Sequence, residues 1–363
     1  MIGAPFSFYI AFLGLLGGFA FGFVARRSAF CTLGAIEETY YGAERSRLRT
    51  WLLAIGVALI GTQSLHFAGV IDLSKSFYLE PHYRLLGSIV GGLLFGMGMA
   101  LVGTCAFGML VRAGGGDMKA LVSVMILAIV SYVTANGVLA YVGLYIIIPS
   151  NIAISGSSSS SVAELLFGPS RVAQLVVVAV LSLGSIGWAL SSPRFLKNTW
   201  GVVAGFVIGG VIIYGWWVTG TIGQSGFEPV QFESYRFARP MGDTLIYLMT
   251  FSGAAITFPI GGVVGVMLGA FVASLFAGTF KFEAFDDARE MKRHFGGAAL
   301  MGMGSIFALG CTIGQGMSGI STLSVNAFVT MFTIVVSAWL GIRYLVEGEI
   351  PSFSQTISRF FKR

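Results

Sequence analysis

Three cysteines are the residues of this sequence best suited to chemistry, and each begins the same short motif. Cys31, Cys105 and Cys311 are each followed by a glycine three positions later. A thiol is soft and polarisable, and burial in apolar surroundings keeps it protonated and able to donate a weak hydrogen bond. Neutral thiols along one axis would suit a soft, sulfur-bearing anion, which thiolates would repel. An odd and small number of cysteines does not indicate a disulfide framework.

The residues that precede the cysteines are repeated as well. The repeats align without gaps, at an offset of 74 residues between Cys31 and Cys105 and of 206 residues between Cys105 and Cys311. The matched segments are Gly17-Gly18 and Phe21-Gly22 with Gly91-Gly92 and Phe95-Gly96, and Gly96-Met97-Gly98 with Gly302-Met303-Gly304. A weaker fourth copy begins at Gly201 and contains no cysteine. Gly-interrupted apolar segments in both halves of a chain are typical of transporters with repeat symmetry, in which the segments meet at the binding site.

The residues that follow each cysteine are candidates for shaping such a site. Gly34, Gly108 and Gly314 allow close backbone approach, and the free N–H groups of a half-helix N-terminus suit an anion. Gln315 is expected either to line the path or to form an interhelical hydrogen bond. Thr312 is expected to bond to the local backbone. A single cysteine in a membrane helix is usually a small core residue, so it is the threefold recurrence that favours a function.

Other kinds of site are not indicated. The histidines at 66, 82 and 294 have no metal-ligand spacing, and neither a Walker A motif nor a Ser/His/Asp arrangement stands out. We therefore expect no catalytic residue, no metal and no cofactor.

Transmembrane helices are the elements that must position these motifs. Charged residues make up only 10% of the 363 residues, apolar residues make up 55%, and the mean hydropathy is +0.84. Soluble domains carry about 25% charged residues, so a soluble protein is excluded. The apolar runs are too long for the segments of about ten alternating residues found in a transmembrane barrel. We expect an all-α polytopic membrane protein with about nine spanning helices, short half-membrane (re-entrant) helices and internal pseudo-symmetric repeats.

The chain is expected to form a single integral membrane domain over residues 1–363. Within it, residues 1–150 form the first repeat half and residues 196–350 the second. Residues 151–195 form a connecting region with a Ser-rich stretch, and residues 351–363 form a basic interfacial tail.

The basic residues predict an orientation in the membrane. No lysine or arginine precedes the first apolar run, whereas Arg26 and Arg27 follow it and more arginines occupy the loop at 43–49. The positive-inside rule then places the N-terminus outside and this loop in the cytoplasm. The basic tail is expected to lie in the cytoplasm too. The net charge of +6 is explained by topology, and no nucleic-acid partner is expected.

The repeated Gly-Gly, Gly-Met-Gly and Cys-x-x-Gly segments resemble those of the YeeE/YedE sulfur-transport family, specifically its thiosulfate transporters. The likeness covers about residues 6–345 and is strongest at 91–117 and 296–324. It implies uptake of thiosulfate through the bacterial inner membrane, along a path that contains the three cysteines. It also implies a small soluble sulfur-carrier or rhodanese-type protein as a partner.

Three alternatives remain open from the sequence. A membrane sulfurtransferase or thiol oxidoreductase would carry a persulfide on a cysteine, although no Cys-x-x-Cys pair occurs. A transporter of another sulfur or selenium species would use the same thiols. A scaffold that anchors a soluble sulfur carrier would depend on its loops instead. The sequence favours the transporter over an enzyme.

Overall fold

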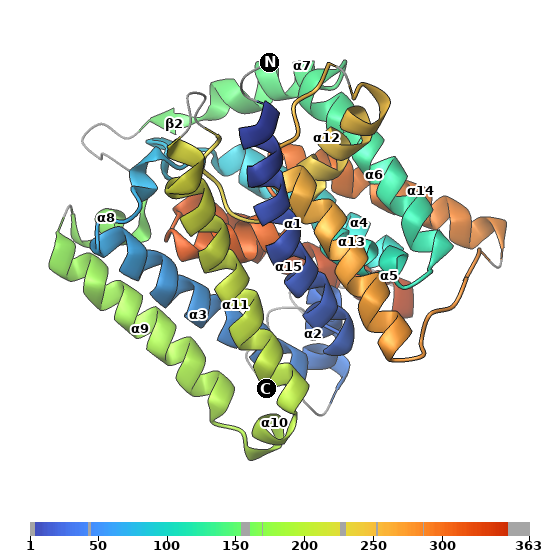
Figure 1. Ribbon diagram of the computed structural model, residues 1–363, viewed down its shortest axis with the longest axis horizontal. Coiled ribbons are helices and arrows are strands. Elements are labelled where there is room, and N and C mark those ends of the chain that lie inside the picture. Colours follow the sequence, from blue (N-terminus) through green and yellow to red (C-terminus); the bar gives the residue numbers. More distant parts are fainter. Residues whose placement is uncertain are drawn as a thin grey trace.

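The computed structural model describes residues 4–42, 45–153, 160–168, 170–225, 230–251, 253–285 and 287–347. This part of the chain is almost entirely helical (Figure 1), and the short strands β1 (His82–Tyr83) and β2 (Ile152–Ala153) pair antiparallel. The larger helices are α1 (Ala4–Arg27), α2 (Thr32–Tyr41), α3 (Ser46–Phe67), α4 (Leu85–Val102), α5 (Ala106–Gly114), α6 (Met118–Asn136), α9 (Arg171–Leu190), α11 (Thr199–Gly220), α12 (Ala238–Met249), α13 (Phe258–Phe276), α14 (Ala288–Phe307) and α15 (Val325–Glu347). The short helical segments are η1 (Leu73–Lys75), η2 (Phe77–Leu79), α7 (Ala140–Val142), η3 (Gly143–Ile147), η4 (Ile148–Ser150), α8 (Val162–Phe167), α10 (Pro193–Lys197), η5 (Ile222–Gln224) and η6 (Gly314–Gly319).

Eight helical stretches in the described ranges are long and apolar enough to cross a membrane. They contain α1, α3, α4, α6, α9, α11, α13 and α15. Helix α14 has 20 residues, a similar length, but it carries several charged residues in its first two turns. The chain is therefore an all-α polytopic membrane protein, as the sequence predicts, with eight candidate spans in the described ranges where about nine were expected.

Each cysteine lies at a break between a long helix and a short one. Cys31 joins α1 to α2, Cys105 joins α4 to α5, and Cys311 joins α14 to a helix at residues 312–321 that contains the π-helical η6. These short helices have nine or ten residues, which at 1.5 Å per residue is about half the thickness of the bilayer core. They are half-membrane helices in length, and the chain reverses after each of them into α3, α6 or α15.

The three breaks share a backbone conformation. Two positions before each cysteine, Ala29, Gly103 and Leu309 have φ values of +50°, +80° and +56°. A left-handed residue at this point ends a helix, and a residue other than glycine adopts it at a cost of about 1–2 kcal/mol. The repeated sequence motif therefore corresponds to a repeated way of ending one helix and starting the next.

A fourth pair of this kind is formed by α11 and α12, where the sequence contains no cysteine. Between them the described residues 231–237 are non-helical, yet most of them are buried. Phe237 occupies the position before α12 that a cysteine occupies before α2 and α5. Irregular backbone at membrane depth is tolerated only where protein or a watery cavity surrounds it.

One end of the helix bundle, here called the basic face, gathers arginine-bearing helix ends. The C-terminus of α1 carries Arg26 and Arg27, and Arg27 stacks on Trp200 at the start of α11. Arg49 at the start of α3 donates to the carbonyl of Trp188 near the end of α9 at 2.5 Å. Helices α2 and α5 run toward this face, whereas α12 and the helix at 312–321 run toward the opposite face, where α4 and α15 begin.

Glycines let pairs of long helices touch backbone to backbone. Helix α1 lies along α13 in the same direction (Figure 1), and a methyl group added at most of these glycines would collide with the other helix. The glycines are Gly14, Gly18 and Gly22 on α1, and Gly261, Gly265 and Gly269 on α13. Helix α4 uses Gly92 and Gly96 against α15 in the same way. Spacing by four residues puts such glycines on one helix face, as in tightly packed membrane helices.

Some sequence predictions fall outside the described residues. Residues 155–159 of the Ser-rich stretch, the first residues of the chain and the tail at 351–363 lie there. Within the described part, Ser160 is buried and donates to the carbonyl of Tyr78 at 3.2 Å. The end of the Ser-rich stretch is therefore fixed against the loop that precedes α4.

Candidate functional site

The two cysteines of the first half lie side by side. The Cys31 thiol is 3.6 Å from the Thr104 hydroxyl, and the Thr32 hydroxyl donates to the Cys105 sulfur at 3.8 Å. Each thiol thus contacts the threonine that neighbours the other cysteine. Residues 74 positions apart are thereby brought into one cluster.

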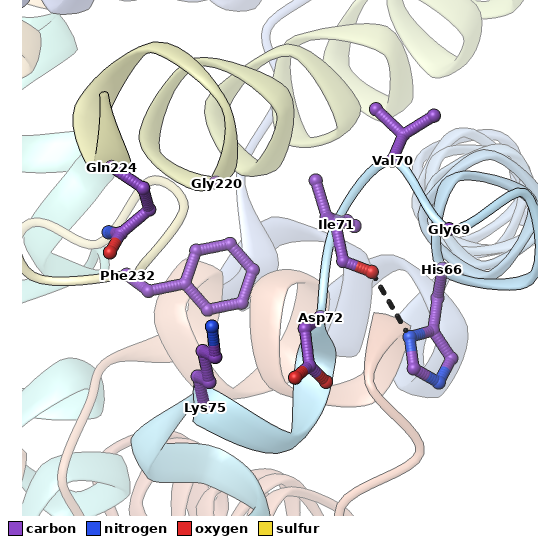
Figure 2. A pocket seen from close by; sticks show the side chains of 9 residues that line it. All are labelled: His66, Gly69, Val70, Ile71, Asp72, Lys75, Gly220, Gln224 and Phe232. Carbon is purple, nitrogen blue, oxygen red and sulfur yellow. Dashed lines mark hydrogen bonds between the residues drawn. The ribbon is translucent and has the colours of Figure 1, made fainter.

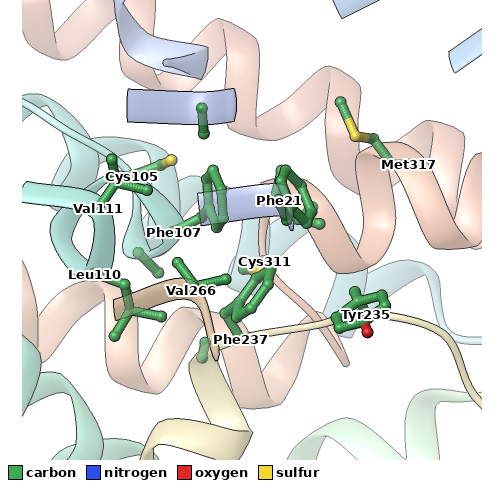
Figure 3. Packing of buried hydrophobic residues seen from close by; sticks show 14 of the residues in the cluster. Phe21, Cys105, Phe107, Leu110, Val111, Tyr235, Phe237, Val266, Cys311 and Met317 are labelled. Atoms are coloured by element: carbon green, nitrogen blue, oxygen red, sulfur yellow. The ribbon is translucent and has the colours of Figure 1, made fainter. Parts of the chain in front are cut away.

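The third cysteine lies in the same buried core, because Cys105 and Cys311 both pack among the rings of Phe21, Phe107 and Phe237 (Figure 3). The Thr312 hydroxyl beside Cys311 is buried and has no hydrogen-bond partner among the described residues. The expectation that Thr312 bonds to its local backbone is therefore wrong. We call the three cysteines and their neighbours Thr32, Thr104 and Thr312 the thiol cluster.

The spacing of Cys-x-x-Gly has a structural cause. The Gly108 N–H donates to the Cys105 sulfur at 3.4 Å, and the Gly314 N–H donates to the Cys311 sulfur at 3.5 Å. Each sulfur thus accepts from the N–H three residues later, as an N-cap side chain does. A methyl group at Gly108 would collide with Thr104, and one at Gly314 would press on Arg236. A methyl group at Gly34 would meet the guanidinium of Arg47, which lies beside the first motif.

An apolar, aromatic zone surrounds the thiols (Figure 3). The ring centroids of Phe21 and Phe107 are 4.4 Å apart, and those of Phe107 and Phe237 are 5.0 Å apart. Cys105 and Cys311 are 1% and 0% exposed, whereas Cys31 is only partly buried. Such surroundings exclude water, and the N-terminal ends of the short helices supply partial positive charge there. A soft anion would find weak S–H donors and no opposing carboxylate among the contacts of the thiol cluster.

The contact pattern bears on one expectation from the sequence, the role of Gln315. Gln315 donates to the Ala308 carbonyl at 2.6 Å, so it braces the break before Cys311. Its side-chain oxygen is buried without a hydrogen-bond partner among the described residues.

Sequence reasoning missed two arginines beside Cys311. Arg236 and Arg239 line a small cavity of about 30 Å³ together with Ser305 and Cys311. Arg236 is 9% exposed and pairs with Glu233, which is 3% exposed. The sequence places both arginines between two apolar runs, where basic loop residues are common, so it gives no signal that Arg236 is buried.

A larger cavity of about 340 Å³ lies nearby on the face opposite the basic face (Figure 2). It is enclosed by the end of α3, the loop after it and Phe232 of the buried non-helical segment. Lys75 and Asp72 supply one charge of each sign. Hydrogen bonds from Ser74 hold the pKa of the Asp72 carboxyl below its usual range, so this carboxylate stays ionised and offsets Lys75.

Comparison with known proteins places the chain among sulfur transporters. A family model described as sulphur transport matches residues 27–340. The thiosulfate transporter TsuA of Escherichia coli (strain K12) is 25% identical over 347 residues, which cover 90% of this chain and 92% of that protein. The thiosulfate transporter TsuA of Spirochaeta thermophila is 25% identical over 338 residues, covering 90% of this chain and 96% of that protein. The probable transporter YedE of Salmonella typhimurium is 28% identical over 106 residues, 29% of this chain and 25% of that protein.

Proposed function

The chain belongs to the sulphur transport family, and we propose that it carries thiosulfate across the bacterial inner membrane through the thiol cluster. The observation that carries this proposal is that the three cysteine segments meet in one buried core, where the Cys31 and Cys105 thiols each contact the other's neighbouring threonine and Cys311 packs among the same aromatic rings. The relatives that are named thiosulfate transporters align with nearly the whole chain. The transported species is thus a soft sulfur oxyanion.

The thiols act in this proposal as neutral hydrogen-bond donors. The terminal sulfur of thiosulfate is bound in turn by the S–H groups of Cys31, Cys105 and Cys311, without forming a covalent bond. The N-terminal ends of the short helices offset the charge of its oxygens. Gly34, Gly108 and Gly314 allow the ion to approach the backbone, and Gln315 and Thr312 hold the Cys311 side of the path.

The orientation follows from the basic face. Positive-inside logic puts this face in the cytoplasm, with the N-terminus outside and the C-terminus inside. Thiosulfate then enters on the Cys311 side and leaves past Cys31, which is the more exposed thiol. A small soluble sulfur-carrier or rhodanese-type protein would receive the ion at the basic face.

Uptake of sulfur-labelled thiosulfate into proteoliposomes tests this function. We expect wild-type protein to transport thiosulfate and Cys105→Ala to lose at least about tenfold of the initial rate, which corresponds to about 1.4 kcal/mol. Ser182→Ala is the matched control, because Ser182 is a small buried residue of α9 whose hydroxyl bonds to its own helix. Equal uptake by Cys105→Ala and wild type would remove the thiols from the path.

The same uptake assay distinguishes thiosulfate from the alternative substrates. Absence of thiosulfate uptake by folded wild-type protein, together with uptake of a selenium or other sulfur species, would reassign the substrate. Mass spectrometry under non-reducing conditions would reveal the added sulfur mass of a persulfide, which the proposed mechanism does not form.

A further inference from the structure

The cavity beside Cys311 differs in charge from the other cavities of its face. Two arginines and no carboxylate line it. The cavity of Figure 2 contains one lysine and one aspartate, and a third, of about 260 Å³, contains Glu164 and Arg171. Of these three cavities, only the one beside Cys311 has more arginine and lysine residues than acidic residues in its lining. A fourth, with three arginines, lies at the basic face near Arg45 and Arg194.

Arg236 is held in this cavity at an energetic cost. It lies on a buried non-helical segment, paired with Glu233 and 3.4 Å from the side-chain oxygen of Gln231. Its guanidinium also lies 5.1 Å from the ring centre of Phe77. Taking an ion pair out of water usually costs as much as the attraction returns, and an apolar pair of similar volume is often more stable. Fold stability alone therefore does not explain a buried arginine here.

An unused polar group points to a ligand at the same place. The hydroxyl of Tyr78 is buried and has no hydrogen-bond partner among the described residues, and the side chain as a whole is 4% exposed. A methyl group at Gly314 would lie 3.5 Å from this hydroxyl and 3.0 Å from the Cβ of Arg236. Buried polar atoms without partners are rare in native proteins and call for an explanation. A bound oxyanion would provide the missing acceptor.

We propose that this cavity is the recognition site for the oxyanion end of the substrate, which deepens the proposed function and rests on it. The anion binds to N–H groups of Arg236 and Arg239 that their carboxylate partners Glu233 and Asp243 do not use, while its sulfur points to Cys311. Guanidinium groups match tetrahedral oxyanions through paired N–H donors. Charge and oxygens are thus recognised by arginines, and sulfur is recognised by thiols.

The cavity must widen for this step. Its volume of about 30 Å³ holds one or two water molecules, and a five-atom dianion is larger. The side chain of Arg239 is 46% exposed, and it is 3.9 Å from the carboxylate of Asp243. This loose pair opens first and lets the substrate reach the remaining N–H donors of Arg236, which stays paired with Glu233.

Competition by sulfate distinguishes recognition of the oxyanion by the arginines from recognition of sulfur by the thiols. Sulfate shares the charge and tetrahedral shape of thiosulfate but has no terminal sulfur for the thiols. We expect sulfate, present on both sides of proteoliposomes, to inhibit thiosulfate uptake competitively, raising KM without changing the maximal rate. In the double variant Glu233→Gln/Arg236→Gln, which leaves no buried charge unpaired, the inhibition constant for sulfate should rise at least about tenfold. Arg239→Gln, at a partly exposed position, should raise it less.

Arg171→Gln is the matched control, because it removes one arginine from the same face without touching this cavity. Competition that persists in the control and disappears in the double variant supports the proposal. Uptake by wild type without sulfate competition, or equal competition in the double variant, would overturn it.

Calorimetric titration of the purified, detergent-solubilised proteins with sulfate keeps the test independent of transport. Loss of wild-type sulfate binding in the double variant supports the site even if thiosulfate uptake fails and the proposed function falls. Absence of sulfate binding to wild type, or equal binding by a folded double variant, counts against the site. Should the double variant fail to fold, Arg239→Gln decides, and unchanged sulfate binding by that variant would refute the proposal.

Discussion

At the scale of single residues, the threonines of the thiol cluster make a sharper test than the cysteines. Thr32 donates to Cys105, and Thr104 lies against Cys31. Replacing either by valine keeps the shape but removes a hydrogen bond worth about 0.5–1.5 kcal/mol, and thiols without a fixed partner turn away from the path. We expect Thr32→Val and Thr104→Val to lower the initial rate of thiosulfate uptake by about two- to tenfold, measured in proteoliposomes.

Thr134→Val is the comparison variant for this prediction. Thr134 is also a buried threonine, but its hydroxyl bonds to the Val130 carbonyl of its own helix. A similar loss in all three variants would mean that the effect comes from general destabilisation and would count against a role for the cluster.

The thiols and their glycines could be located from the sequence because the motif recurs at fixed offsets. Arg236 and Glu233 could not be assigned, because their repeat has no cysteine and is interrupted by a non-helical segment. The pairing of the Cys31 and Cys105 segments, in which each thiol contacts the other's neighbouring threonine, could not be predicted either. Which side chains touch depends on how helices pack in three dimensions, and no spacing encodes that.

At the scale of helices, the backbone contact between α1 and α13 predicts that the loss of stability on replacing a glycine depends strongly on where that glycine lies. A side chain at Gly18 would run into the backbone of Gly262, whereas a side chain at Gly184 of α9 would meet open space. Overpacking a close contact costs about 1–3 kcal/mol or more. We expect Gly18→Leu to lower the midpoint of thermal unfolding in detergent by several degrees or to abolish folding. Gly184→Leu should unfold like wild type, and equal midpoints for the two variants would contradict the packing.

The long apolar helices were predictable from hydropathy, and half-length helices were expected, but the positions of the half-length helices were not predictable. The apolar run at residues 243–259, for example, contains the end of α12, a break and the start of α13. Hydropathy averages over a window longer than a half-helix, so a short helix and the turn beside it merge into one apolar stretch. The breaks themselves depend on left-handed residues, and Ala29 and Leu309 give no composition signal for them.

At the scale of the whole molecule, the basic face predicts the orientation in the membrane. In a background without the three native cysteines, Lys75→Cys and Lys197→Cys place one exposed thiol on each face. Positive-inside topology puts Lys197 in the cytoplasm and Lys75 outside. A membrane-impermeant maleimide should therefore label Lys75→Cys in intact cells and label Lys197→Cys only after permeabilisation. The reverse pattern would invert the direction of transport proposed above.

The backbone contact between α1 and α13 also has a consequence for what drives transport of the anion. Backbone contact at successive glycines leaves no side chains between these two helices, so we expect them to stay fixed relative to one another during transport. A path whose frame does not move would pass ions equally well in both directions. Moving a dianion into a cell at −100 mV costs about 4.6 kcal/mol, so accumulation would stop far below the outside concentration. Net uptake would then be set by the rate at which the cytoplasm consumes the ion, because consumption keeps the inside concentration low.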